Sequence, residues 1–154
     1  MSKNKVTIII PVFNEKNYID KIIKKVKSNV YFNKQIIVVD DYSSDGTRKI
    51  IKKIKYIDKI IFHKKNLGKG AAIKSAIPYI KGSIVVIQDA DLEYNPADLN
   101  KLIKIMISNN SRVIYGSRVL NKKRYNSDMF ISNFTTFGNH VLTIISNFLN
   151  NQKL

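Results

Sequence analysis

The sequence contains no cysteine, and acidic residues are scarce in it. Its 154 residues include 27 lysines and arginines but only 11 aspartates and glutamates, so the net charge at pH 7 is +16. The lack of cysteine excludes a disulfide framework and a thiolate metal site. No uninterrupted apolar run approaches the roughly 18 residues that a membrane-spanning helix needs. We therefore expect a globular chain that does not cross a membrane.

The positive charge has two explanations that the sequence leaves open. Lysines dominate it, and four of them fall on the polar face of a predicted helix: Lys21, Lys24, Lys25 and Lys27. A genome-wide bias toward Lys, Ile and Asn would give such solvated lysines, while an anionic partner would attract them. Nucleic-acid binding has no support other than the charge, because the sequence lacks interleaved exposed aromatics and a recognised binding module. We expect no nucleic-acid partner.

Short apolar runs alternate with segments of helical periodicity along most of the chain. This alternation predicts an α/β domain with a mostly parallel central sheet and flanking helices. We expect strands at 6–12, 35–39, 59–62, 84–88 and 113–115, and helices at 18–26, 47–55, 71–80 and 96–108.

No repeat or linker divides the sequence, so we expect one domain over residues 1–154. Within it, residues 1–120 carry the strand pattern, and residues 121–154 form an apolar helical tail that packs on the sheet or lies at a membrane interface. The polar start lacks the apolar segment and cleavage site of a secretory signal. We expect a cytoplasmic protein, or a peripheral one at the cytoplasmic face of a membrane.

Polar residues collect where the predicted strands end. In a parallel α/β sheet, ligands bind outside the carboxyl ends of the strands, so these residues are the candidate site. They are Asn14 and Glu15, Asp40 and Asp41, Asp89 and Asp91, and Arg118.

Three carboxylates stand within five positions after the strand at 84–88: Asp89, Asp91 and Glu93. Carboxylates this close repel one another unless a cation lies between them. Two or three oxygen ligands with open positions suit Mg²⁺ or Mn²⁺, which bind through a few carboxylates and the phosphates of a substrate. A simpler alternative is that Asp91 caps the turn toward Pro96.

Other candidates also have two interpretations. Asp40 and Asp41 either make the turn before Ser43 or hydrogen-bond a base or ribose. Lys69 stands between two glycines at a helix start, which favours a nearby phosphate, although the spacing is not that of a P-loop. We expect both histidines, His63 and His140, to be structural, and no Ser/His/Asp triad is evident.

Five segments in this order resemble the family 2 glycosyltransferases, and within them the branch that transfers mannose or glucose to dolichyl or polyprenyl phosphate. The resemblance covers about residues 5–150. The segments are IIIPVFNEKNYI, IIVVDDYSSDGT, NLGKGAAIKSA, VVIQDADLEYNPADL and VIYGSR.

This resemblance implies a GT-A fold, a UDP- or GDP-hexose donor and a divalent cation, Mg²⁺ or Mn²⁺. It also implies roles for individual residues. Pro11, Phe13 and Glu15 would line the nucleotide pocket, and Val39 and Asp41, with Asp40 beside them, would hold the base and ribose. Asp89, Ala90 and Asp91 would form the metal and diphosphate motif. Glu93 would be a further metal contact. Arg118 would face the donor or acceptor phosphates.

The implied reaction is an inverting hexose transfer to a lipid phosphate at a membrane surface. Negative charge develops on the departing nucleoside diphosphate, where the metal held by Asp91 and the guanidinium of Arg118 would stabilise it. A phosphate acceptor is already anionic and needs no general base, whereas a hydroxyl acceptor would need one.

The sequence departs from the family pattern at two places. Tyr42 stands where glycine is common. The chain also ends at Leu154, where similar proteins continue into a Thr/Asp motif and basic residues that complete the acceptor site. It therefore resembles a shortened member, either an active hexosyltransferase or a non-catalytic remnant that binds the nucleotide sugar.

Overall fold

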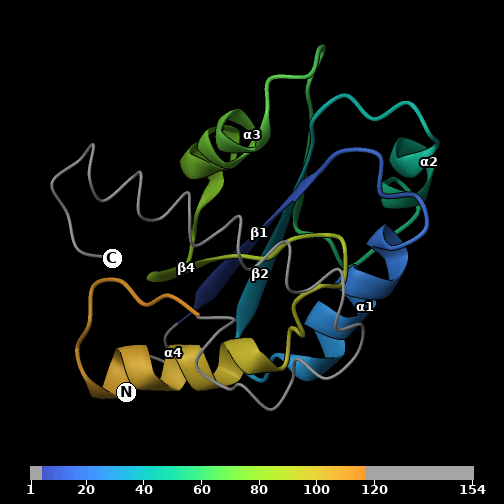
Figure 1. The fold of residues 1–154 in the computed structure, drawn as a ribbon. Helices are drawn as coiled ribbons and strands as arrows, with labels where there is room; N and C mark the ends of the chain where they lie inside the picture. The colour runs from blue at the N-terminus through green and yellow to red at the C-terminus, as the bar shows by residue number, and fades with distance from the viewer. Residues whose placement is uncertain (1–4, 117–154) are drawn as a thin grey trace, which may run out of the picture. The chain divides into compact units, whose positions relative to one another are not determined.

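The fold is built on a four-stranded sheet in which every pair of neighbours is parallel. In the computed structural model, residues 5–116 are described. The strand order is β3-β2-β1-β4, with β1 in the interior (Figure 1). The strands are β1 (Val6–Val12), β2 (Lys34–Asp40), β3 (Lys59–Phe62) and β4 (Ile84–Ile87).

Helices cover both faces of this sheet. Helix α3 lies on one face, and α1 and α4 lie on the other (Figure 1); α2 packs beside α1. The helices are α1 (Ile19–Asn29), α2 (Thr47–Ile51), α3 (Lys69–Ala76) and α4 (Asp98–Ser108), and a 3₁₀ turn, η1 (Ile77–Tyr79), follows α3.

Strand β1 is apolar along its length because both of its faces are covered. All seven of its residues are buried. Ile8 and Ile10 pack into the larger core with α1 and α4, while Ile9 points to the opposite face and packs against Ala72 and Ala76 of α3. Alternate residues of a strand point to opposite faces, so a continuous apolar run is the expected pattern for a strand buried on both sides.

The connections place a crevice beside β1. The chain passes from β1 to β2 and β3 on one side, and later returns to add β4 on the other. The strand order therefore reverses at β1, and ligands of open α/β sheets bind at such a switch point, outside the carboxyl ends of the strands. The chain leaves β1 at Val12, β2 at Asp40 and β4 at Ile87.

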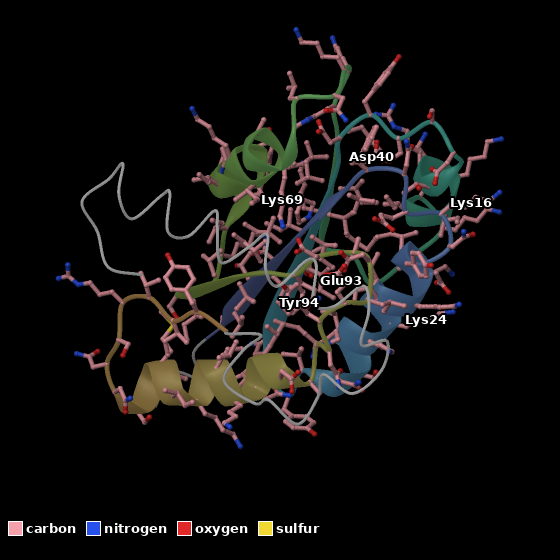
Figure 2. All side chains as sticks on the ribbon, in the orientation of Figure 1. Lys16, Lys24, Asp40, Lys69, Glu93 and Tyr94 are labelled. Atoms are coloured by element: carbon pink, nitrogen blue, oxygen red, sulfur yellow. The ribbon has the colours of Figure 1, made fainter. Side chains whose placement is uncertain are left out.

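The polar face of α1 is as the periodicity predicts. Ile19, Ile22, Ile23 and Val26 are buried, and the four lysines Lys21, Lys24, Lys25 and Lys27 are exposed. Lys24 forms an ion pair of 2.6 Å with Asp20 one turn away, and its side chain points away from the sheet (Figure 2). These lysines act as a solvated helix face in the structure.

Four of the predicted strands are confirmed, and the fifth is wrong. Residues 113–115 form no strand; Val113 and Tyr115 are 61% and 88% exposed and pair with nothing that the described part of the chain provides. A three-residue apolar run alone does not predict a strand, because a strand also needs a neighbour.

Three helices are shorter than predicted, and α4 differs only in that it begins at Asp98. Beyond α2 the amides of Lys53 and Ile54 bond to the carbonyls of Ile50 and Ile51, three residues back, so the last turn tightens and the helix stops. Helix α3 passes into η1 at Ile77, because Pro78 has no N–H to continue the helical ladder.

The chain divides into two compact units, Met1–Tyr115 and Gly116–Leu154. The fold described here belongs to the first. The predicted helical tail at 121–154, with His140, lies outside the described residues. Among residues 5–116, no helix is long and apolar enough to cross a membrane.

We predict that Ile8→Ala destabilises the chain by about 2–5 kcal/mol, because it leaves a cavity under the central strand. Ile8 is 0% exposed, whereas Ile107 on α4 is 42% exposed. The matched substitution Ile107→Ala should therefore change the free energy of unfolding by less than about 0.5 kcal/mol. Urea denaturation followed by circular dichroism measures both, and equal effects would contradict the two-sided burial of β1.

Candidate active site

A cavity of about 240 Å³ lies at the carboxyl ends of β1, β2 and β4, on the side of α3. All but two of its lining residues are site residues predicted from the sequence, brought together from four segments of the chain. Val12 and Ala72 were not predicted as site residues, although each lies within one of the five segments that carry the family resemblance. The lining consists of Pro11, Val12, Phe13, Glu15, Asp41, Lys69, Ala72, Asp89, Ala90 and Asp91.

One wall of the cavity is acidic. Asp89 and Asp91 both line it, as their spacing predicts, and Glu15 faces them from the end of β1. Partial burial, and then the negative charges of Asp91 and Asp45, raise the pKa of Glu15. The carboxylates therefore repel one another in the free protein, and a cation would relieve that repulsion.

Lys69 supplies a positive charge to this wall. Its Nζ lies 2.5 Å from Oδ1 of Asp89, and their side chains are 58% and 27% exposed. Lys69 is the first residue of α3 and extends from there over the sheet (Figure 2). A cation at a helix N-terminus is opposed by the helix dipole, so Asp89 is the interaction that favours this placement.

The donor set fits a metal ion that a diphosphate completes. Within residues 5–116, no three or more Asp, Glu, His or Cys side chains gather closely enough to hold a metal by themselves. Mg²⁺ commonly takes one or two carboxylates and draws its other ligands from water and substrate phosphates. Asp89 and Asp91 are the two carboxylates that could fill this role.

Glu93 is exposed and is not among the residues that line the cavity. Its backbone N–H donates to Oδ1 of Asp91 at 3.0 Å. Asp91 thus makes a local turn, as the simpler interpretation holds, and also faces the cavity. These two roles do not exclude each other.

The loops after β1 and β2 are fastened to each other by side chains. The backbone N–H of Asn14 donates to Ser43 Oγ at 2.9 Å. In return, the backbone N–H of Ser44 donates to the side-chain Oδ1 of Asn14 at 2.9 Å. The amide of Glu15 donates to Thr47 Oγ1 at 3.0 Å. These reciprocal bonds set the position of Glu15 before any ligand arrives.

The carboxylate of Asp41 is already occupied by the protein. Its Oδ1 accepts from His63 Nδ1 at 2.7 Å and from the amide of Leu67 at 2.9 Å, and its Oδ2 accepts from the amide of Gly68 at 2.7 Å. Burial raises the pKa of Asp41, but these hydrogen bonds outweigh it and leave the pKa below its ordinary value. Asp41 faces the cavity while it anchors the loop that leads to Lys69.

His63 links Asp41 to α3. It is 8% exposed, and its Nε2 lies 2.9 Å from Ser75 Oγ on α3. Sequence reasoning missed this chain of aspartate, histidine and serine, because the three residues are far apart in the sequence. His63 is enclosed between β3 and α3, which agrees with a structural role.

Asp40 and Val39 do not line the cavity. Val39 is buried in the small core under α3. Asp40 points to the opposite face, where its Oδ2 pairs with Arg48 Nε at 2.5 Å. Adjacent residues of a strand point to opposite faces, so the expectation that Asp40 and Asp41 share the ligand is wrong for the side chain of Asp40.

Tyr42 shows why glycine is common at its position. Its φ is +69°, in the left-handed region that disfavours side chains with a Cβ. The Arg48 guanidinium lies 5.3 Å from the centroid of the Tyr42 ring and 5.3 Å from that of Phe62. This stacking offsets part of the backbone strain. Arg118, the other predicted phosphate contact, lies outside the described residues.

Comparison with known protein families assigns the chain to one of them. The family model described as "Glycosyl transferase family 2" matches residues 7–154. The chain belongs to glycosyltransferase family 2. The parallel sheet with its flanking helices is accordingly that of a GT-A fold.

The chain is similar to two proteins of methanogens. It is 32% identical over 149 residues to an uncharacterised protein of Methanocaldococcus jannaschii. That alignment covers 94% of this chain and 59% of the relative. It is 31% identical over 143 residues to UDP-N-acetylglucosamine–dolichyl-phosphate N-acetylglucosaminyltransferase of Methanococcus voltae, covering 81% of this chain and 56% of the relative. The chain thus spans less than two thirds of these curated relatives.

A solved structure shares the fold. It is the mannosyltransferase PcManGT from Pyrobaculum calidifontis in complex with GDP-Man and Mn²⁺, with a TM-score of 0.58 and 25% identity. The similarity covers 69% of this chain and 33% of the mannosyltransferase.

We predict that Asp41→Asn lowers the free energy of unfolding at pH 7 by about 1.5–3 kcal/mol, because it weakens charge-assisted hydrogen bonds to the loop. The pKa of Asp41 is lowered by folding, so its contribution is present above the unfolded pKa and is lost as the pH falls through the folded pKa. The variant should therefore lose stability less steeply in acid than the parent chain.

Denaturation curves from pH 7 down to pH 2 measure this difference. Asp98→Asn, at an exposed position on α4, is the matched control and should keep the acid dependence of the parent chain. The same acid dependence in both variants would show that Asp41 is not the group responsible.

Proposed function

We propose that this chain forms the donor site of a hexosyltransferase that uses a UDP- or GDP-hexose and a divalent cation. The observation that carries the proposal is the cavity at the switch point of a family 2 sheet, where two carboxylates after β4 meet a lysine at the start of α3. Acidic and basic groups side by side suit a ligand that combines a metal ion with a diphosphate.

The positions of the chain's own residues support a role for each. Asp89 and Asp91 would hold the metal, and Lys69 would contribute its charge to the diphosphate. Pro11, Phe13 and Glu15 form the β1 side of the nucleotide pocket. Asp41 retains a free lone pair for the nucleoside, although its main task is to hold the loop before α3. The metal, when bound, stabilises the negative charge of the departing nucleoside diphosphate.

We propose a polyprenyl or dolichyl phosphate as the acceptor, with inversion at the anomeric carbon. The name of the Methanococcus voltae relative includes a dolichyl phosphate acceptor, which supports this class of substrate. A phosphate oxygen attacks without a general base. No histidine lines the cavity within residues 5–116, and the imidazole nitrogens of His63 are engaged by Asp41 and Ser75. Arg118 is proposed to face the phosphates. Such an acceptor would place the protein at the cytoplasmic face of a membrane.

The second candidate is nucleotide-sugar binding without transfer. It is favoured by the lining of the cavity, because the described residues offer contacts for a donor and none that we assign to an acceptor. Release of nucleoside diphosphate from a nucleotide sugar, in the presence of a polyprenyl phosphate, distinguishes the two candidates.

We predict that UDP or GDP binds in the presence of Mn²⁺ and that a chelator abolishes this binding. Asp91→Asn should lower the nucleotide affinity at least about tenfold, because a neutral amide is a poor metal ligand. Isothermal titration calorimetry measures each affinity and identifies the base. Asp98→Asn removes the same charge from an exposed position and should bind like the parent. Unchanged binding by Asp91→Asn would remove the metal assignment.

A further inference from the structure

Lys69 occupies the acidic wall in a way that the donor site does not explain by itself. Its ammonium group contacts Oδ1 of Asp89 at 2.5 Å, and Asp89 is one of the two carboxylates assigned to the metal. An ammonium group and a divalent cation on the same carboxylate repel each other. The contact seen in the free protein therefore competes with a metal ion for Asp89.

From this contact we infer that Lys69 is an exchangeable counter-ion: it neutralises Asp89 in the free protein and moves to the diphosphate when the metal arrives. This inference rests on the proposed function. Its consequence is that the metal alone binds weakly, since it must displace an ion pair, while the metal together with a nucleoside diphosphate binds well.

The side chain of Lys69 is able to make this exchange. It is 58% exposed, it is not part of either apolar core, and its four-carbon stem rotates freely. Its backbone, by contrast, is fixed, because the preceding amides of Leu67 and Gly68 are bonded to Asp41. Only the end of the side chain needs to move.

The start of α3 has room for a diphosphate, with which the ammonium group of Lys69 would pair after it leaves Asp89. The first amides of a helix have no partner within the helix, and they favour an anion together with the helix dipole. A Cβ built on Gly70 would meet no atom within 4 Å, so the space over this turn is open. A diphosphate beside it would give Lys69 a stronger partner than Asp89, which then faces the metal.

The remaining carboxylates explain why the exchange is favourable. Among the described residues, the ion pairs of the cavity reach Asp89 alone, and none reaches Asp91 or Glu15. One ammonium group thus offsets a wall that holds three carboxylates. A divalent cation offsets more of that charge, but it becomes bound tightly only when Lys69 has an anion to move to.

The test removes the charge of Lys69 and measures Mn²⁺ binding without any nucleotide. Lys69→Met keeps the length and apolar stem of the side chain. We expect it to bind Mn²⁺ alone about tenfold more tightly than the parent chain, because no internal cation competes for Asp89. Electron paramagnetic resonance of free Mn²⁺ during titration of the full 154-residue chain measures this affinity directly.

A second titration gives the other half of the exchange. With Mn²⁺ present, Lys69→Met should bind UDP or GDP, whichever the parent binds, about tenfold more weakly, because the diphosphate has lost a cation. The affinity for Mn²⁺ alone and the affinity for nucleotide in the presence of Mn²⁺ multiply to the overall stability of the ternary complex. A gain of about tenfold in the first and a loss of about tenfold in the second would therefore leave that overall stability unchanged.

Two further variants serve as controls. Lys69→Arg retains the positive charge and should bind Mn²⁺ alone as weakly as the parent chain. Lys74→Met removes a charge from an exposed position of the same helix and should change neither affinity.

Three results would overturn the exchange. Equal affinity of parent and Lys69→Met for Mn²⁺ alone, with nucleotide binding intact in the parent, would show that Lys69 does not compete; the proposed function would stand. Nucleotide binding by the parent that chelator leaves unchanged would mean that Lys69 replaces the metal permanently. Failure of the parent to bind either nucleotide with Mn²⁺ would remove the donor site and the exchange with it.

Discussion

The interior position of β1 is the constraint on which the rest of the structure depends. Every residue of the strand is buried, and it is bonded in parallel to β2 on one side and β4 on the other. Parallel strands present their carboxyl ends at one edge, so β1 fixes where three separate loops meet. The cavity exists because those loops leave from a common edge and the strand order reverses there.

The acidic residues near that edge fall into two groups. Asp40 and Asp41 are buried and compensated by fixed donors of the protein, namely Arg48 for the first and His63 with two backbone amides for the second. Asp89, Asp91 and Glu15 line the cavity, and of these three only Asp89 has a cationic partner within the described part of the chain. The first group holds loops in place, although Asp41 also faces the cavity, and the second has carboxylates that the protein itself compensates less.

The sequence predicts the sheet well because apolar runs and strand ends are local signals. Residues 84–88 and 35–39 are close to the observed strands, and the carboxylates that follow them mark the site. The partners of side chains are not local. The pairing of Lys69 with Asp89 joins α3 to the loop after β4, and the bonds of Asp41 join the end of β2 to the loop before α3.

The errors have physical causes of the same kind. Asp40 and Asp41 look equivalent in the sequence, but strand alternation sends them to opposite faces. Residues 113–115 look like a strand, but no neighbouring strand pairs with them among the described residues. Tyr42 looks like an arbitrary departure from glycine until its φ of +69° and its stacking on Arg48 are seen together.

The order of the strands also bears on how the chain assembles. Val6 pairs with Lys34 and with Ile84, so the first pairing closes a short loop and the second a much longer one. Closing the longer loop costs more chain entropy, and non-local pairings of this kind form slowly. We expect β1, β2 and β3 to associate before β4 docks. Asp89 and Asp91 follow β4, so the acidic wall would be the last part of the cavity to form during folding.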